Sequence, residues 1–207
     1  MKILITAGPT REYIDPVRFI SNPSTGKMGY LIAEECISQG YEVVIISGPT
    51  HLKIPSGVRC INVETAEEMK EAVLKIFPDV DVLIMSAAVS DWKPAVRANK
   101  KLKRKKAWSL KLLPNPDILK EVAKIKRKGQ TVIGFALETT DIVKNAGRKL
   151  KEKNLDLIIA DTPEFFGEGK ASRVVFIHRD GRVEEFKGIK KEEVARKIID
   201  FLPIFKV

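Results

Sequence analysis

The sequence has few of the residues that build disulfide bonds, metal sites and covalent catalytic centres. Its two cysteines, Cys36 and Cys60, lack the spacing of a metal or redox motif, which predicts a reducing, cytoplasmic environment. Its two histidines, His51 and His178, lie far apart, and neither accompanies a serine or cysteine nucleophile in a recognisable motif. No apolar run approaches the ~18–20 residues that cross a bilayer, and the N-terminus predicts a strand rather than a signal peptide. We therefore expect a soluble protein with one domain, residues 1–207, and no membrane partner.

Acidic residues are missing between Asp91 and Asp117, a segment that holds nine basic residues: Lys93, Arg97, Lys100, Lys101, Lys103, Arg104, Lys105, Lys106 and Lys111. Removing these nine charges from the net charge of +10 leaves about +1, so the basicity describes a local flap at about residues 93–111. A clamp for a small polyanion such as a triphosphate is one interpretation, and a solvated loop is another. A nucleic-acid patch is less favoured, because the basic run at residues 93–111 has one aromatic residue, Trp108, and no known nucleic-acid-binding motif.

Neither of the two common phosphate-binding loops is present. Ser21 and Met28 occupy positions at which a P-loop needs glycine and then serine or threonine. The second expected strand, residues 42–46, continues into Ser47-Gly48-Pro49 and does not end with the acid that holds ribose in dinucleotide-binding folds. An NAD(P)-dependent oxidoreductase with a Rossmann-like sheet therefore remains an alternative with weak support.

Residues 17–29 nevertheless predict an anion site, because they connect the first expected strand to an amphipathic helix at residues 28–39. Asparagine, serine, threonine and glycine before a helix present free N–H groups and the positive end of the helix dipole. An ordinary capped helix is the alternative. The candidate residues of this phosphate or substrate loop are Arg18, Ser24, Thr25, Gly26 and Lys27.

The order of apolar runs and turn residues predicts a three-layer αβα, Rossmann-like fold around a mainly parallel sheet. Strands are expected at residues 2–6, 42–47, 60–63, 80–87, 131–136 and 155–160, and the run at 80–87 is typical of a central strand. Asp180-Gly181 predicts a late antiparallel hairpin of residues 173–178 and 182–186.

The remaining helices are expected after recognisable capping residues. Thr65 opens a capping box, Asn115 caps a helix with Pro116 at its first position and Gly129 after its end, and Thr140 caps a helix that reaches Lys153. A last helix covers residues 190–202. Ligands of such sheets bind beyond the carboxyl ends of the strands, which places residues 22–27, 87–91 and 135–139 at a common site.

Twelve segments match a known family in order along almost the whole chain: residues 5–12, 14–22, 24–29, 47–49, 65–69, 87–92, 101–103, 115–118, 134–136, 138–139, 149 and 153–156. They closely resemble phosphopantothenate–cysteine ligase, a family of coenzyme A synthesis. Its members join the carboxylate of 4′-phosphopantothenate to the amine of cysteine. CTP activates the carboxylate as an acyl-cytidylate and releases pyrophosphate, and cysteine then displaces CMP.

The resemblance also implies the cofactors and partners of the chain. Mg²⁺, lysines and helix N-termini offset the charge of the triphosphate, CTP is the co-substrate, and no flavin is expected in this chain. The resemblance implies a homodimer, with Arg18 and the flap near the partner subunit. It leaves open whether a phosphopantothenoylcysteine decarboxylase is a separate partner or is fused to the ligase, as in many bacteria. Because the chain begins one residue before the first expected strand, either a free-standing ligase or an excised ligase domain fits. The choice of CTP over ATP stays open.

Two residues match catalytic positions of the family. Asn22 matches the asparagine that stabilises the acyl-nucleotide, although turn chemistry is the ordinary role of an asparagine in a loop. Lys101 matches a lysine that binds the nucleotide from the flap, and Arg104 stands where the family has another lysine.

Further residues match nucleotide contacts of the family: Met85, Ser86, Ala87, Asp91, Lys101, Pro116, Asp117, Ile118, Leu119, Phe135, Lys149 and Lys153. Asp91 is expected to contact either the ribose or the Mg²⁺–triphosphate unit, with the metal held mainly by the triphosphate. Phe135 is expected to pack near the base, although core packing at a strand end is the ordinary alternative. An anionic ligand would offset the repulsion between Lys149 and Lys153, which lie one helical turn apart.

Overall fold

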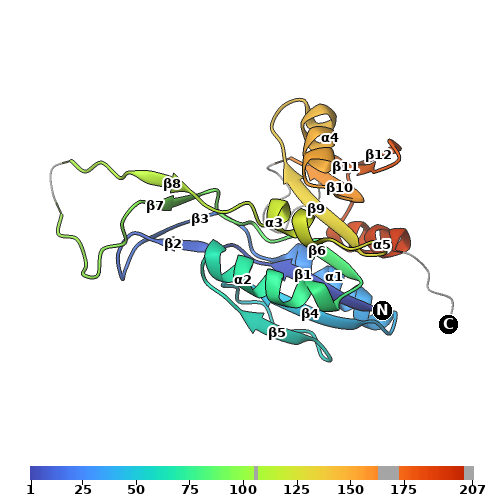
Figure 1. The fold of residues 1–207 in the computed structure, drawn as a ribbon, viewed down its shortest axis with the longest axis horizontal. Coiled ribbons are helices and arrows are strands. Elements are labelled where there is room, and N and C mark those ends of the chain that lie inside the picture. The colour runs from blue at the N-terminus through green and yellow to red at the C-terminus, as the bar shows by residue number, and fades with distance from the viewer. Residues whose placement is uncertain (105–106, 163–172, 203–207) are drawn as a thin grey trace.

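A computed structural model of the chain describes residues 1–104, 107–162 and 173–202, and its centre is a sheet of eight described strands (Figure 1). The strands follow the order β12-β11-β10-β9-β6-β1-β4-β5. Their bounds are β1 Lys2–Ala7, β4 Glu42–Ser47, β5 Arg59–Asn62, β6 Val82–Met85, β9 Thr131–Leu137, β10 Leu157–Asp161, β11 Arg173–His178 and β12 Val183–Lys187. In this order, adjacent strands from β10 to β5 run parallel to one another. Strand β11 is antiparallel to both β10 and β12. The predicted α/β fold with a late antiparallel hairpin is confirmed.

Helices cover both faces of the sheet: α1 Lys27–Ser38, α2 Ala66–Ile76, α3 Ile118–Ile125, α4 Ile142–Glu152 and α5 Lys191–Phe201, with a short 3₁₀ helix at Phe77–Asp79. Because side chains alternate along a strand, β1 directs Ile3 and Ile5 toward α1 and α5 and Leu4 toward α2, α3 and α4. The central strand β6 is buried along its whole length, as its apolar run predicted. No helix among the described residues is long and apolar enough to span a bilayer.

Two helix starts differ from the sequence prediction. Asp117, not Asn115, caps α3 by accepting from the N–H of Lys120 at 3.3 Å, and α3 ends at Ile125, before the predicted end near Gly129. Asn115 instead donates through Nδ2 to the carbonyl of Ser90 at 2.9 Å. Asp141, not Thr140, precedes α4 and has a left-handed backbone, which aspartate tolerates better than threonine does. The capping box of Thr65 and Glu68 at α2 is confirmed.

Two short hairpins beside the sheet were not predicted. Strands β2 Arg11–Tyr13 and β3 Phe19–Ser21 form one, and β7 Trp92–Pro94 and β8 Leu112–Pro114 form the other. The second hairpin belongs to a long extension, the described residues 92–104 and 107–114, that we call the arm; it projects from the sheet and contains the described part of the expected basic flap (Figure 1). Three-residue strands give little periodic signal, and β7 and β8 each contain a proline, a residue that is confined to edge strands.

Candidate functional site

A cavity of about 630 Å³ lies beyond the carboxyl ends of the parallel strands β1, β6, β9 and β10. Parallel strands end at a common edge, so the loops that follow them converge there. The lining contains all but two of the residues proposed from the sequence: Asn22, Ser24, Thr25, Gly26, Lys27, Met85, Ser86, Ala87, Asp91, Pro116, Asp117, Ile118, Leu119, Phe135, Lys149 and Lys153. Their roles in binding stay predictions.

The loop before α1 is held close to the sheet by glycine. A Cβ on Gly29 would lie 2.6 Å from the Cβ of Ala7 and 2.7 Å from Oγ of Ser86, so the first turn of α1 contacts β1 and the end of β6 directly. Gly26 precedes the helix with a φ of 82°, a left-handed conformation that glycine adopts without strain. The first turn of α1 has no acidic side chain, so its dipole is not neutralised by the helix itself.

Asn22 connects the loop between β3 and α1 to the loop after β6. Its Nδ2 donates to the carbonyl of Ala88 at 3.2 Å and to the carbonyl of Val89 at 3.1 Å. Both N–H groups of the amide are therefore engaged with main chain. This geometry agrees with loop chemistry, the ordinary role of asparagine, and donation to a ligand requires that at least one of these bonds be exchanged.

Two lysines from the end of α4 enter the cavity as ion pairs. Nζ of Lys149 lies 2.8 Å from Oε1 of Glu138, and Nζ of Lys153 lies 3.0 Å from Oδ2 of Asp117. The paired carboxylates offset the repulsion between the two ammonium groups. An anionic ligand can therefore bind these lysines if it competes with the carboxylates.

Phe135 and Met85 occupy strand positions rather than loop positions. Phe135 lies within β9, not after it, and its partly buried ring packs against the core cluster that contains α1 and α5 while it also lines the cavity. The sulfur of Met85, the last residue of β6, lies 3.5 Å from Oγ1 of Thr6. Both side chains thus serve the core and the cavity wall together.

Asp161 and Lys191 are cavity residues that sequence reasoning missed. Asp161 ends β10 with 7% of its surface exposed, and Lys191 begins α5 with 6% exposed. Burial raises the pKa of Asp161 from 3.8 to about 7, and the charge of Lys191 acts in the opposite direction. A signal was available, because an acid that ends an apolar strand and a lysine at the positive end of a helix dipole are both unusual.

Arg18 and Lys101 do not line the cavity, and neither do the other described basic residues of the flap. Lys101 is exposed on the arm, which extends away from the sheet (Figure 1). Arg18 lies against Asp15, at the turn between β2 and β3. Lys105 and Lys106 lie outside the described residues.

Asp91 is exposed at the cavity and follows β6 by six residues. Within the described residues, no group of three histidine, cysteine or acidic side chains is arranged to hold a metal ion. Asp91 can therefore supply a single carboxylate to a metal whose other ligands come from a substrate or from water.

Comparison with known proteins reveals extensive similarity. The family model described as DNA/pantothenate metabolism flavoprotein C-terminal domain matches residues 1–204. The coenzyme A biosynthesis bifunctional protein CoaBC of Borreliella burgdorferi is 44% identical over 204 residues, which cover 97% of this chain and 52% of that protein. The chain thus spans about half the length of the curated relatives that it matches.

Two solved structures are similar over nearly the whole chain. The C-terminal domain of a coenzyme A biosynthesis bifunctional protein CoaBC has a TM-score of 0.82 and 43% identity, with 96% of this chain and 92% of that chain covered. The DNA/pantothenate metabolism flavoprotein from Streptococcus pneumoniae has a TM-score of 0.85 and 28% identity, with 97% of each chain covered.

Proposed function

This chain belongs to the family described as DNA/pantothenate metabolism flavoprotein C-terminal domain, and from that membership we propose that it is a ligase of coenzyme A biosynthesis. The proposed reaction joins the carboxylate of 4′-phosphopantothenate to the amine of L-cysteine and converts CTP to CMP and pyrophosphate. The observation that carries the proposal is the 44% identity to the CoaBC protein over 97% of the chain. The cavity supports it, because its volume of about 630 Å³ lies within the range typical of small-molecule sites.

In the first step, a carboxylate oxygen of 4′-phosphopantothenate attacks the α-phosphorus of CTP. A P–O bond forms to give the acyl-cytidylate, and the P–O bond to pyrophosphate breaks. Lys149 and Lys153 are proposed to leave Glu138 and Asp117 and to bind the nucleotide, while Lys27 and the first N–H groups of α1 face the cavity from its other side. Cations placed in advance stabilise the negative charge that shifts to the leaving group.

In the second step, the neutral amine of cysteine attacks the acyl carbon and the C–N bond forms. CMP leaves with the electrons of the C–O bond, and the amine nitrogen releases one proton to water. The amide of Asn22 is proposed to exchange its bond to Ala88 or Val89 for a bond to the oxyanion that forms on the acyl group. A neutral donor of this kind is worth about 2.7–4 kcal/mol when it acts only on the developing charge. The carbonyl left by Asn22 can be hydrated by cavity water.

A magnesium ion is proposed as the cofactor. The described residues fit an ion held mainly by the triphosphate, because they offer the carboxylate of Asp91 and no group of three ligands. When bound, Mg²⁺ would neutralise phosphate charge and orient the triphosphate.

A homodimer is proposed as the assembly that the chain forms. Large apolar side chains of the arm and of β3 with its preceding turn are exposed: Val17, Phe19, Trp92, Val96, Trp108, Leu112 and Leu113. Exposed apolar groups of this density are typical of interaction surfaces. We also propose that a decarboxylase, fused to this chain or separate from it, acts together with the ligase, since the curated relatives are about twice as long as this chain.

The proposal is tested by measuring pyrophosphate release. The chain is incubated with 4′-phosphopantothenate, Mg²⁺ and, in turn, CTP, ATP, GTP or UTP. We expect release with CTP, and an amide product, detected by mass spectrometry, after cysteine is added. Absence of pyrophosphate with all four nucleotides would overturn the proposed ligase, and release with ATP in preference to CTP would overturn the nucleotide assignment alone.

A further inference from the structure

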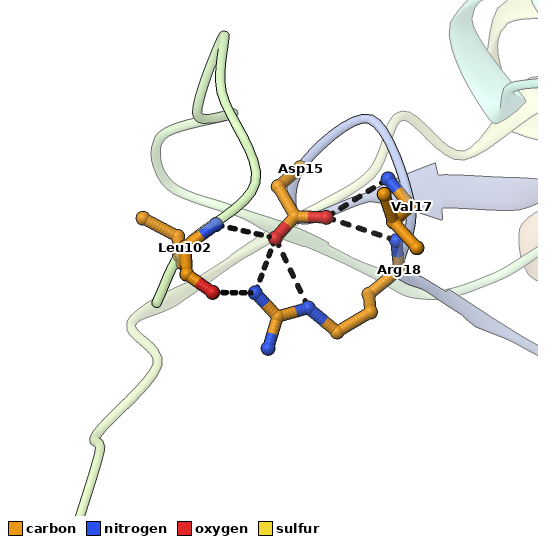
Figure 2. Close-up of polar contacts among 4 residues, drawn as sticks. All are labelled: Asp15, Val17, Arg18 and Leu102. Atoms are coloured by element: carbon orange, nitrogen blue, oxygen red, sulfur yellow. Dashed lines mark hydrogen bonds and ion pairs between the residues drawn. The ribbon is translucent and has the colours of Figure 1, made fainter. Parts of the chain in front are cut away.

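The turn between β2 and β3, residues 14–18, holds the arm at points far away in the sequence (Figure 2). The N–H of Ala98 donates to the carbonyl of Ile14 at 2.9 Å, and the N–H of Leu102 donates to Oδ2 of Asp15 at 3.0 Å. The guanidinium of Arg18 donates through Nη2 to the carbonyl of Leu102 at 3.0 Å. The main-chain N–H and carbonyl of Leu102 are thus both bound by the ion pair of Asp15 and Arg18.

Two ring contacts extend the same attachment. The guanidinium of Arg97 lies 4.8 Å from the ring centre of Tyr13, and that of Arg18 lies 5.5 Å from the ring centre of Trp108. The arm is therefore held on both sides of Leu102: before it, by the contact of Arg97 with Tyr13 in β2, and after it, by the contact of Trp108 with Arg18 in the turn.

The two oxygens of Asp15 have separate partners. Oδ1 accepts from the N–H of Val17 at 2.9 Å and from the N–H of Arg18 at 3.0 Å, which closes the turn. Oδ2 accepts from Nε of Arg18 at 3.0 Å, from Nη2 of the same side chain and from the N–H of Leu102 (Figure 2). One oxygen thus stabilises the local turn, and the other binds the arm.

Burial and charge make this contact specific. The side chain of Asp15 has 0% of its surface exposed, whereas that of Arg18 has 41% exposed. The Arg18 guanidinium, together with the N–H groups of Leu102, Val17 and Arg18, holds the pKa of Asp15 well below its usual range. A buried carboxylate that accepts five hydrogen bonds stays ionised and has a fixed orientation. Its removal therefore leaves each of its donors without that acceptor.

We propose that Asp15 is a positioning residue for Lys101: through Oδ2 it fixes the arm at Leu102 and so orders the arm before the nucleotide binds. The inference rests on the proposed function for its kinetic part, since Lys101 is the expected nucleotide lysine. Lys101 is joined to Leu102 by one peptide bond, which keeps the two Cα atoms about 3.8 Å apart. An arm that is released at Leu102 must be ordered again at the expense of nucleotide affinity.

The test uses substitutions that separate the two oxygens. Asp15→Asn retains one oxygen for the turn and places an NH₂ group against the donors of Arg18 and Leu102. Asp15→Ser retains an acceptor for the turn and has no second oxygen, so it serves where Asp15→Asn does not fold. Asp180 provides the matched control, because its Oδ1 accepts from the N–H of Arg182 at 2.9 Å in the turn between β11 and β12, far from the arm.

The first readout is amide hydrogen exchange at Leu102, followed by NMR in the full chain. Asp15→Asn is expected to raise the exchange rate of the Leu102 amide at least about tenfold, because a hydrogen bond to a buried charge is lost. Asp180→Asn is expected to leave it unchanged. Unchanged protection of Leu102 in both Asp15 variants would overturn the proposal.

The second readout is the steady-state rate of pyrophosphate release. Asp15→Asn is expected to raise the KM for CTP about tenfold with kcat close to that of the original chain, because saturating nucleotide orders the arm. In a Lys101→Ala background, the same substitution is expected to change KM little, since the two residues act through one contact. Equal effects in both backgrounds would overturn the positioning role.

Failure of the proposed function has a different signature. If the original chain releases no pyrophosphate from any of the four nucleotides, the ligase and the kinetic role of Asp15 are both overturned. The exchange rate of Leu102 still decides whether Asp15 holds the arm, because that measurement needs no substrate.

Discussion

The sheet beneath the cavity and the arm beside it differ in how they place apolar side chains. In β1 and β6, buried residues form nearly the whole strand, and the side chains pack between two helical layers. In the arm, by contrast, Trp92, Val96 and Trp108 are each more than half exposed. The arm is attached to β2 and the β2–β3 turn by cation–π contacts and by hydrogen bonds, two of them to the Asp15–Arg18 ion pair. The sheet is stabilised by burial of its own chain, and the arm is held by contacts that a ligand or a partner can exchange.

The charges of the two regions differ in the same way. Cavity lysines such as Lys149 and Lys153 are each paired with a carboxylate at 3.0 Å or less. The cations Arg18 and Arg97 of the turn and the arm lie over aromatic rings, and Arg18 is also paired with the carboxylate of Asp15. The described basic residues of the flap, which carry most of the excess charge of the sequence, therefore lie outside the cavity lining. The cavity and the arm should therefore respond independently to substitution.

The largest expected effect is the loss of ligase activity in Asn22→Ala. We expect kcat for amide formation to fall about 100- to 1,000-fold, because the donor proposed for the oxyanion is removed. Quantification of acyl-cytidylate and amide by mass spectrometry measures the loss. Asn145→Ala is the matched control, since it removes the same group from α4, where Nδ2 donates to the carbonyl of Thr140. Turnover of Asn22→Ala at the original rate would remove Asn22 from the mechanism.

Next in size is a pH-dependent gain of stability in Asp161→Asn. Because folding raises the pKa of Asp161 to about 7, the native state retains a proton that the unfolded chain releases near pH 4, and the carboxyl destabilises the fold increasingly as pH rises from about 4 to above 7. Relative to the original chain, Asp161→Asn is expected to gain about 2 kcal/mol more at pH 8 than at pH 5. Part of this gain is offset because Lys191 loses an opposite charge. Urea unfolding at the two pH values measures the difference, and an equal effect at both would contradict it.

A pair of glycine substitutions tests how closely α1 must approach the sheet. Gly29→Ala is expected to destabilise the fold by about 1–3 kcal/mol, because its Cβ would meet Ala7 and Ser86 at less than 3 Å. Gly147→Ala is the control within α4: a Cβ there meets nothing within 4 Å, so alanine is expected to stabilise the helix by about 0.5–1 kcal/mol. Urea unfolding followed by circular dichroism gives both values. The same sign for both substitutions would contradict the close packing of α1.

The sequence could predict the sheet and the position of the cavity because both depend on local patterns. Apolar runs such as residues 80–87 indicate buried strands, and parallel strand ends converge whatever the exact register. Helix starts were less predictable, since the side chain of Asn115 has a partner, Ser90, that lies 25 residues earlier in the sequence. No local rule reports such a partner.

The attachment of the arm and the two buried residues Asp161 and Lys191 were missed for a different reason. The arm depends on contacts across 84 and 87 residues, between Arg18 or Asp15 and Leu102, that no periodic pattern encodes. From the sequence alone, Asp161 is interpreted as the end of a strand and Lys191 as a solvated helix residue. The fold buries both side chains. Sequence reasoning therefore identified the residues of the site better than it identified what holds them in place.

The smallest expected effect on global stability belongs to Arg97→Ala in the arm. The contact of Arg97 with Tyr13 is exposed, so its loss is worth about 0.5–1 kcal/mol to the attachment of the arm. If the arm opens independently of the sheet, the free energy of unfolding in urea stays within about 0.5 kcal/mol of the original value, while the amide of Ala98 exchanges about threefold faster. Lys100→Ala removes the same charge from an exposed position of the arm and is expected to change neither quantity. A fall in global stability for Arg97→Ala but not for Lys100→Ala would mean that the arm and the sheet unfold together, and the separation of the two regions would then be wrong.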